Sequence, residues 1–300
     1  MTDILSYRFG SLNMIPDVTP NGVFYLPPTG WLTSFYNPPI ILGIGLWGAY
    51  YKQSKTDLHY YTKRIERNYH QQPQAQSYPT KSQADSVLSD NVKKQVGNQL
   101  VWNSYGAYVV NNNQTNLNAS INSAPYAINH LDSRGRAWQG DSWLNKTTRQ
   151  YQNRNQTGNG VTNWKPAGFK QVYHLTNGYS HAYDRGHLLG YALVGGIKGF
   201  NASEANPANI ATQTAWANEA NNPKSTGQNY YEGLVRQALD EGKQVRYRVT
   251  DVYDGNNIVP SGAHIEAKSK DGSLEFNVFV PNVQNNILIN YATGNVKPIG

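Results

Sequence analysis

Residues 183 to 187, Tyr-Asp-Arg-Gly-His, combine side chains that hydrolysis of a phosphodiester would need. An unperturbed histidine titrates near pH ~6.5, so it can take a proton from water at neutral pH. The reaction also needs positive charge for the developing anion and a metal ion to polarise the phosphate. A histidine beside an aspartate and an arginine is nevertheless more often structural than catalytic. The pentapeptide therefore needs support from elsewhere in the chain.

That support comes from residues 209 to 218, which read NIATQTAWAN. The tetrapeptide DRGH followed by N-I-x-x-Q-x-x-x-x-N resembles the signature of the DNA/RNA non-specific endonucleases. Within that family the chain is most similar to the DNA-entry nucleases of Gram-positive bacteria. Matching stretches at 131–136, 165–168, 227–232 and 262–267 extend the resemblance over roughly residues 98–300. DRGH alone is a weak signal, whereas DRGH with the spaced Asn and Gln is a strong one.

The resemblance implies that His187 is the general base that activates water and that Asn218 binds Mg²⁺. The chemistry agrees, because Mg²⁺ prefers oxygen ligands and is often held by one or two protein oxygens plus substrate phosphate. A neutral amide ligand also leaves the ion its full charge for the transition state. We expect Mn²⁺ to substitute for Mg²⁺. Zinc should substitute poorly, because the chain contains no cysteine and no histidine pair at helical spacing.

The same resemblance assigns roles to three more side chains. Asn209 and Gln213 match positions that line the substrate cleft, and Glu232 matches a glutamate that orders the hydrated metal. The alternative for Glu232 is an i,i+4 surface pair with Arg236. On one continuous helix Asn209 and Asn218 would point apart. We therefore expect Asn209 on the approach to a helix that contains Asn218.

Arg185 has two alternative roles. Arg185 could hold the scissile phosphate or pair with Asp184, and we favour the phosphate because a fixed guanidinium suits a dianionic transition state. Asp184 is expected to orient its neighbours rather than bind metal. We expect His174, His181 and His264 to be structural.

A short basic stretch carries much of the formal net charge of +7. Residues 131–170 contain seven Lys or Arg against two Asp or Glu, interleaved with Trp138, Trp143, Tyr151 and Trp164. Such a mixture suits a phosphate-tracking groove with aromatic faces for bases, and we expect Arg134, Arg136 and Arg154 to bind substrate there. The competing interpretation is a solvated basic face with tryptophans in the core.

The N-terminal region differs in composition from the rest of the chain. No charged residue occurs from Val18 to Tyr51, and the run from 31 to 51 is apolar enough for a membrane-associated segment. Pro38 and Pro39 interrupt it, so a simple apolar patch is the alternative. Polar, proline-punctuated sequence from about 68 to 82 is typical of a linker. We expect an appendage at 1–80 and a nuclease domain at 81–300.

Periodicity predicts an α+β fold with an antiparallel sheet, and the family resemblance implies that this fold carries a ββα-metal (His-Me finger) motif. Alternation from Val245 to Thr250 indicates a strand, and Leu274 to Val280 is expected to be its partner after turns at Asp254-Gly255 and Asp271-Gly272. Residues 209–218 and 230–240 should be largely helical, and valines between 87 and 96 indicate another short helix.

Two functions of different classes fit these patterns. The first is a metal-dependent, sequence-nonspecific endonuclease acting on DNA and RNA. The second is a nucleic-acid-binding DNA-uptake protein with weak or lapsed nuclease activity, and the retained set of His187, Asn209, Gln213, Asn218 and Glu232 favours the first. The family resemblance implies an extracellular or cell-surface location. The apolar N-terminal segment suggests possible membrane association, and no protein partner is inferred.

Overall fold

The computed structural model describes residues 78–97, 99–160 and 162–299. All of them belong to one unit of the chain, residues 73–300. The apolar segment at 31–51 and most of the expected appendage at 1–80 lie outside the described residues, so both stay predictions. Within the described part, no helix has the length and hydropathy needed to cross a membrane.

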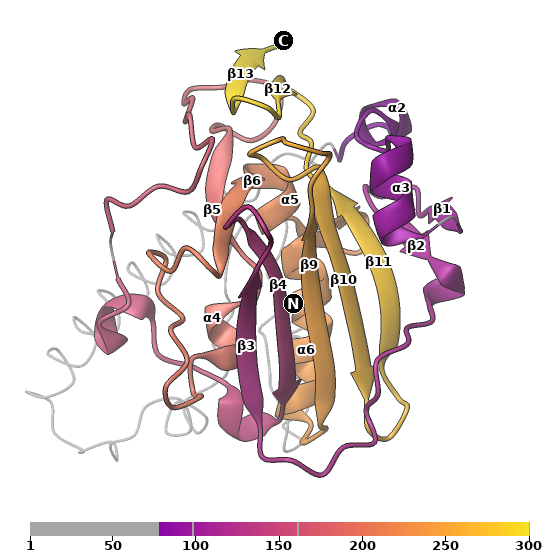
Figure 1. The fold of residues 1–300 in the computed structure, drawn as a ribbon, viewed down its shortest axis with the longest axis vertical. Helices are drawn as coiled ribbons and strands as arrows, with labels where there is room; N and C mark the ends of the chain where they lie inside the picture. The colour runs from indigo at the N-terminus through magenta and orange to yellow at the C-terminus, as the bar shows by residue number, and fades with distance from the viewer. Residues whose placement is uncertain (1–77, 98, 161, 300) are drawn as a thin grey trace, which may run out of the picture. The chain divides into compact units, whose positions relative to one another are not determined.

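A seven-stranded antiparallel sheet forms the framework (Figure 1). Its strand order is β1-β2-β11-β10-β9-β4-β3, so the two N-terminal hairpins flank the three C-terminal strands on opposite sides. The strands are β1 (Leu100–Trp102), β2 (Tyr108–Val110), β3 (Tyr126–Leu131), β4 (Ala137–Leu144), β9 (Val245–Val252), β10 (Gly262–Ser269) and β11 (Glu275–Pro281).

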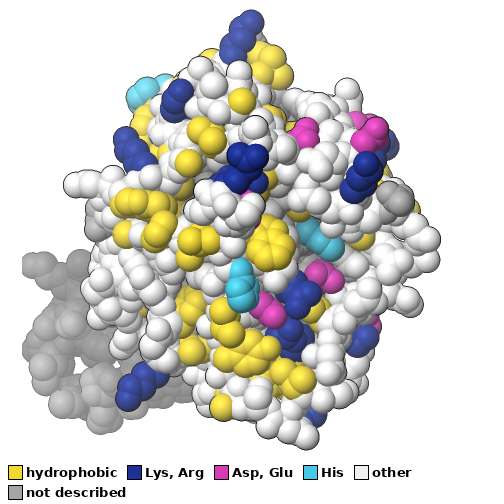
Figure 2. Space-filling model, in the orientation of Figure 1, with side chains coloured by type: hydrophobic (Ala, Val, Ile, Leu, Met, Phe, Trp, Pro, Cys, Tyr) yellow, Lys and Arg dark blue, Asp and Glu magenta, His cyan; other side chains and the backbone are white. Residues whose placement is uncertain are grey.

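The predicted alternation in β9 is confirmed. Val245, Tyr247 and Val249 are fully buried in the main hydrophobic core. On the opposite face Arg246 and Arg248 both pair with Asp141 of β4, at 2.8 Å and 3.3 Å. Charged side chains of both signs are visible on this polar face in Figure 2.

The predicted partner of β9 is wrong. Residues 275–281 form β11 as expected, but β10 lies between β9 and β11 and pairs with both. Ile265 of β10 is opposite Val249 on one side and Val278 on the other. Two strands of similar alternation follow β9, and alternation alone does not say which of them is the neighbour.

Helix α6 (Gln228–Asp240) packs behind the sheet against β9 and β10 (Figure 1). The helix predicted at 230–240 is confirmed, and it buries Tyr231, Val235 and Ala238 fully and Leu234 partly against the core. The same helix carries Glu232, directly after Tyr231. The Glu232 side chain points toward the ββα unit, where it contacts His187.

The ββα unit consists of β5 (Tyr183–His187), β6 (Ile210–Thr214) and α5 (Ala215–Glu219). Strands β5 and β6 are antiparallel, with His187 opposite Ile210. The expectation of a largely helical 209–218 is wrong for its first half, because 210–214 are all buried in β6 and show no periodicity to distinguish strand from helix. His187 lies on the β portion and Asn218 on the helix, as the resemblance implies.

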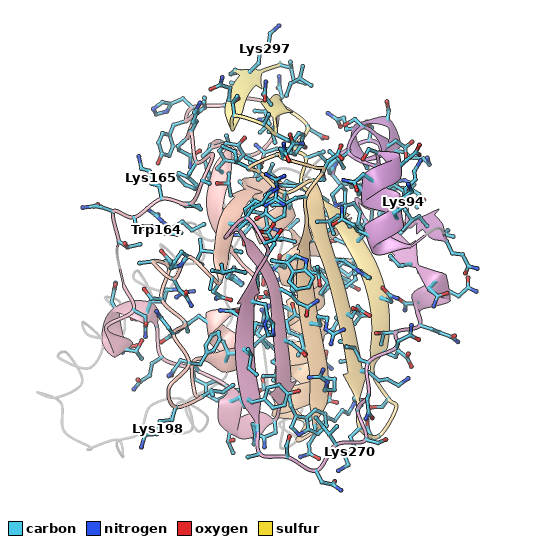
Figure 3. The ribbon with its side chains drawn as sticks, viewed as in Figure 1. Lys94, Trp164, Lys165, Lys198, Lys270 and Lys297 are labelled. Atoms are coloured by element: carbon cyan, nitrogen blue, oxygen red, sulfur yellow. The ribbon has the colours of Figure 1, made fainter. Side chains whose placement is uncertain are left out.

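The remaining elements are short. The helix predicted between 87 and 96 begins only at Asp90, because Ser89 caps it by accepting a hydrogen bond from the backbone of Val92. Figure 3 shows Lys94 of this helix on the opposite side of the view from Lys165. These elements are α2 (Lys81–Asp85), α3 (Asp90–Val96), η2 (Asn111–Asn113), η3 (Lys146–Thr148), η4 (Arg154–Thr157), α4 (Tyr191–Val194), β7 (Asn221–Asn222), β8 (Ser225–Thr226), β12 (Ile287–Asn290) and β13 (Asn295–Pro298).

Candidate active site

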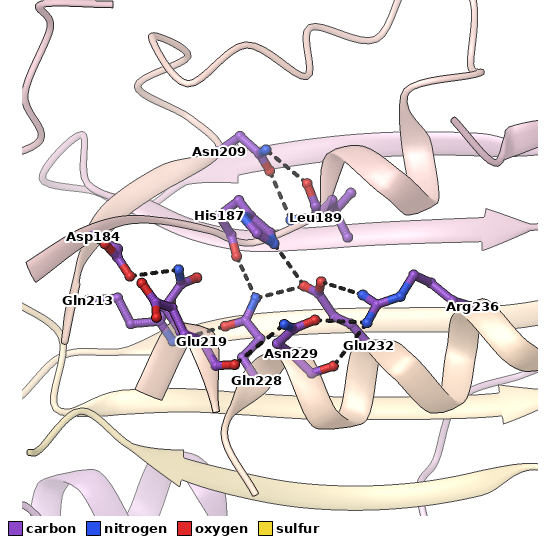
Figure 4. Close-up of polar contacts among 11 residues, drawn as sticks. Asp184, His187, Leu189, Asn209, Gln213, Glu219, Gln228, Asn229, Glu232 and Arg236 are labelled. Atoms are coloured by element: carbon purple, nitrogen blue, oxygen red, sulfur yellow. Dashed lines mark hydrogen bonds and ion pairs between the residues drawn. The ribbon is translucent and has the colours of Figure 1, made fainter. Parts of the chain in front are cut away.

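His187 is held at the end of β5 by two residues of α6 (Figure 4). Its ring nitrogen Nε2 lies 3.0 Å from Glu232 Oε1. Its backbone carbonyl accepts a hydrogen bond of 2.6 Å from the side-chain amide of Gln228. The His187 side chain is 20% exposed, so solvent can reach the ring. The ββα unit and the long helix therefore meet at this histidine.

Glu232 is buried, and its two oxygens are both engaged. Oε1 also accepts a hydrogen bond from Gln228 Nε2 at 3.0 Å, and Oε2 lies 3.4 Å from Arg236 Nη1. Burial by itself raises the pKa of Glu232, but the charge and hydrogen bond of His187, with Gln228 and Arg236, hold this pKa below its ordinary value. Glu232 is thus an ionised carboxylate, which accepts hydrogen bonds and cannot donate one. A neutral His187 ring must then carry its proton on Nε2 and its lone pair on Nδ1.

Gln228 connects this pair to the second strand of the ββα unit. Its Oε1 accepts a hydrogen bond of 3.0 Å from Gln213 Nε2, and Gln213 packs against Gly186. A Cβ atom at position 186 would lie 2.4 Å from Gln213 Cβ, so only glycine fits there. Sequence reasoning missed Gln228, although it falls in the matching stretch 227–232.

Asn218 is a half-buried residue near the end of α5. Thr214 starts this helix by accepting a hydrogen bond from the backbone of Ala217. The Asn218 amide nitrogen donates to Asp184 Oδ2 at 3.0 Å. Its amide oxygen accepts no hydrogen bond from a described residue. Asp184 therefore fixes which end of the amide is open, as its expected orienting role requires.

Asn209 is buried immediately before β6, on the approach to α5. Its Oδ1 accepts a hydrogen bond from the backbone N–H of Leu189 at 3.0 Å, and its Nδ2 donates to the carbonyl of the same residue at 3.1 Å. These two bonds fix the chain directly after His187. With Gln213 also buried and bonded to Gln228, both amides that were expected to line the cleft engage protein groups here.

Arg185 bonds to backbone carbonyls in this structure and does not pair with Asp184. Its Nε donates to the carbonyl of Trp164 at 2.8 Å and its Nη2 to the carbonyl of Thr162 at 2.9 Å. The guanidinium also lies 5.4 Å from the centre of the Phe169 ring. Asp184 contacts His181 and Asn218 instead. Both hydrogen-bond partners of Arg185 are neutral, so among the described residues its charge has no balancing carboxylate.

The sequence of the chain also matches a known protein family. The family model of the DNA/RNA non-specific endonucleases matches residues 103–296. The chain belongs to this family. The structure of NucA from Streptococcus agalactiae with magnesium bound is 46% identical, covers 70% of this chain and 94% of its own, and has a TM-score of 0.65. The NucA structure with no metal bound gives the same values.

The nuclease is therefore a non-specific endonuclease that hydrolyses phosphodiester bonds, and nucleic acid is its substrate. The α+β fold with its ββα motif, predicted from the sequence, is confirmed by the sheet, by α5 and by the likeness to NucA.

The three arginines expected to bind substrate lie in different surroundings in the nuclease. Arg134 is exposed at the turn between β3 and β4. Arg136 pairs with Asp132 at 2.6 Å, donates to two backbone carbonyls of the β9–β10 connection and covers the Tyr253 ring at 4.0 Å. Arg154 in η4 pairs with Glu204 and lies 4.5 Å from the Tyr191 ring. Of these three, only Arg134 has its charge free of a carboxylate among the described residues.

The aromatic residues of the basic stretch are divided between the core and the surface. Trp143 is fully buried in β4 and belongs to the core, whereas Trp138 and Tyr151 are 37% and 66% exposed. The core interpretation is thus right for Trp143. Tyr151 donates a hydrogen bond to Asp240.

A second polar cluster lies beside Asn218. His181 Nε2 is 2.9 Å from Asp184 Oδ1 and 3.5 Å from Glu219 Oε1. The hydrogen bonds from Asp184 and then Glu219 raise the pKa of His181 to about 10. One atom from each of the three lies within 4.8 Å of the others, so the cluster could hold a metal ion. From the sequence, His181 is expected only to be structural, and this cluster is not predicted.

Proposed function

We propose that this nuclease cleaves DNA and RNA with His187 Nδ1 as the base and with Mg²⁺ held by Asn218. The observation that carries the proposal is that two side chains of the ββα unit, His187 and Asn218, are each held by a carboxylate. Glu232 fixes the His187 ring from one side, and Asp184 fixes the Asn218 amide at the end of α5.

His187 acts on the attacking water. Nε2 donates to Glu232, so Nδ1 is free to accept the proton as the water oxygen forms its bond to phosphorus and the bond from phosphorus to the leaving oxygen breaks. Glu232 stabilises the imidazolium that results, in the way a buried carboxylate orients a catalytic histidine. This contact supports a positioning role for Glu232 rather than the metal-ordering role that the resemblance implies.

Asn218 suits a hard cation such as Mg²⁺, because Asp184 holds the amide nitrogen and leaves the oxygen open. When bound, the ion supplies positive charge that polarises the phosphate and stabilises the leaving oxygen. Mn²⁺ takes the same kind of oxygen ligand and should substitute. The relative NucA has been described with magnesium bound, which supports this choice of metal.

The other predicted residues act on the site in different ways. Asn209 and Gln213 position the backbone after His187 and the amide of Gln228, because their own amides are bonded within the protein. Arg185 anchors the backbone at 162–164 and supplies charge. Arg134 is free to contact a phosphate, while Arg136 and Arg154 act through their contacts with the chain.

The biological setting is also a proposal. We infer an extracellular or cell-surface nuclease of the DNA-entry type, on the resemblance of its motifs. Membrane association would have to come from residues 31–51.

Replacement of Asn218 tests the metal proposal. Asn218→Ala should abolish plasmid cleavage at ordinary Mg²⁺ concentrations, while Asn218→Asp should keep metal binding and turn over more slowly, because the added negative charge offsets the ion's field at the phosphate. Cleavage by the wild-type chain should stop in EDTA and resume with Mn²⁺. Asn221→Ala, at an exposed position just after α5, is the matched control. Normal cleavage by Asn218→Ala at low Mg²⁺ would refute the proposal.

A further inference from the structure

A cavity of about 800 Å³ opens beside the ββα unit. Residues of the segment 165–173 form one wall, His181 and β5 form another, and Asn295 and Val296 of β13 complete the lining. The volume falls within the range of about 300–1,000 Å³ that is usual for small-molecule sites. The cavity could thus enclose a group the size of a nucleotide.

Positive charge dominates the lining. Lys165 is exposed and makes no ion pair or hydrogen bond with a described residue, and Figure 3 shows it pointing outward from the loop. Lys170 donates to the neutral amide oxygen of Asn295 at 2.9 Å. Arg185 is bonded to two neutral carbonyls. Asp184 is the one carboxylate among the lining residues, and it is already paired with His181, which also lines the cavity. The charges of Lys165, Lys170 and Arg185 are therefore available to an anionic ligand.

Aromatic surface lies next to these cations. Tyr173 is 64% exposed on the rim, and Phe169 is half-buried beneath the Arg185 guanidinium. In Figure 2 basic and hydrophobic side chains lie together over the region of β5, β12 and β13. Cationic groups around an open aromatic face are how proteins hold unpaired nucleic acid, with phosphate on the cations and base on the ring.

The lining offers little for reading base identity. The Gln171 amide is turned inward, where Oε1 accepts from the backbone of Ala182 and Tyr183 and Nε2 donates to the Tyr183 carbonyl. A site of this kind would bind by stacking and charge, which tolerate any sequence. That property suits a non-specific endonuclease.

The cavity also lies next to the proposed reaction centre. Asp184 lines it and accepts the hydrogen bond from Asn218 at 3.0 Å, and Arg185 lines it two residues before His187. We infer that the cavity is a nucleotide subsite for an unpaired strand, in which Lys165 and Lys170 bind a phosphate neighbouring the scissile one and Tyr173 stacks on a base. The inference rests on the proposed function for its position relative to the cleaved bond.

Binding without cleavage provides the test. The full chain in EDTA is titrated into fluorescent single-stranded and duplex oligonucleotides, and anisotropy gives the dissociation constants. Tyr173→Ala should weaken single-strand binding roughly 5- to 100-fold, the loss typical of one stacked base, and Tyr173→Phe should restore it. Lys165→Ala with Lys170→Ala should reduce the salt slope of single-strand binding by about 0.7 for each phosphate that the lysines no longer neutralise.

The double variant Lys93→Ala with Lys94→Ala is the matched control, because it removes the same charge from exposed positions of α3. It should leave the single-strand salt slope unchanged. If the control lowered the slope as much as the cavity variant, or if duplex binding weakened as much as single-strand binding, the inference would be wrong. Inorganic phosphate as a competitor separates a simple anion site from a nucleotide site. Equal competition by phosphate and by a mononucleotide would overturn the stacking role.

Cleavage assays separate this inference from the proposed function. A wild-type chain that fails to cleave DNA with Mg²⁺ refutes the proposed function, whatever the cavity variants bind. If the wild-type chain cleaves DNA and the cavity variants bind and cleave single strands equally well, only the subsite is refuted. The thermal unfolding midpoint of each variant shows whether it is folded. If Tyr173→Ala does not fold, the lysine variants still test the subsite.

Discussion

His187 and Glu232 are 45 residues apart in the chain, yet their side chains meet at 3.0 Å. The family resemblance implies a functional role for both, and it leaves the contact between them unspecified. The contact depends on how α6 packs behind the sheet, which is a property of the tertiary fold. Gln228 shows the same limit, because nothing in its sequence context predicts that it bridges His187, Glu232 and Gln213.

Glu232→Gln tests the orienting role at this scale. The variant keeps the shape of the side chain and removes the charge that stabilises the imidazolium, so kcat should fall at least about tenfold with KM little changed. Glu241→Gln, at an exposed glutamate just after the same helix, is the control. If added Mg²⁺ restored the activity of Glu232→Gln, the metal-ordering role implied by the family resemblance would be the correct one.

At the scale of elements, α5 shows why residues 209–218 were hard to predict. The helix has five residues, too few to be stable alone. It is held by the Thr214 cap and by Trp216, which is fully buried and donates a hydrogen bond to Ser225 at 3.1 Å. Tertiary packing therefore decides its conformation. The longer α6, with a clear apolar stripe, could be predicted from sequence.

The ion pairs of His181 join β5 to α5 and should make stability depend on pH. Because the folded-state pKa of His181 is raised to about 10, the stabilisation is fully present below the unfolded value near ~6.5 and is lost as the pH rises through about 10. His181→Asn should cost about 1.5–3 kcal/mol at pH 6 and much less at pH 10. Urea unfolding in EDTA measures this difference, with His130→Asn on the exposed face of β3 as the control. A difference that does not change with pH would contradict this explanation.

Arg136 joins two other elements, the β3–β4 turn and the β9–β10 connection. Arg136→Ala should lower the free energy of unfolding by about 1.5–3 kcal/mol, because it removes the charged hydrogen bonds to Asp132 and to two carbonyls. Arg134→Ala removes the same charge from an exposed position, so its effect on stability should be within about 0.5 kcal/mol. Chemical denaturation of the two variants measures both values. Equal destabilisation would show that the hydrogen bonds of Arg136 contribute little.

For the whole molecule, the sequence predicts the kind of fold better than its topology. Alternation in β9 and the stripe in α6 indicate an α+β protein, but the order of the sheet places β4 next to β9, with β3 beyond it, across a long separation in sequence. The net charge can likewise be predicted from the sequence, whereas its distribution over the surface cannot. The net charge of +7 predicts a polyanionic partner, whereas the surfaces that present it depend on which cations are already paired, as Arg136 and Arg154 are.

The central claim is that His187 is the base of a metal-dependent endonuclease. The most direct measurement compares plasmid cleavage by the wild-type chain and by His187→Ala in Mg²⁺, with DNA binding measured in parallel in EDTA. Cleavage should fall by at least about 10²-fold, the effect of losing a general base, while binding persists and added imidazole restores part of the rate. Cleavage by His187→Ala at the wild-type rate would contradict the claim.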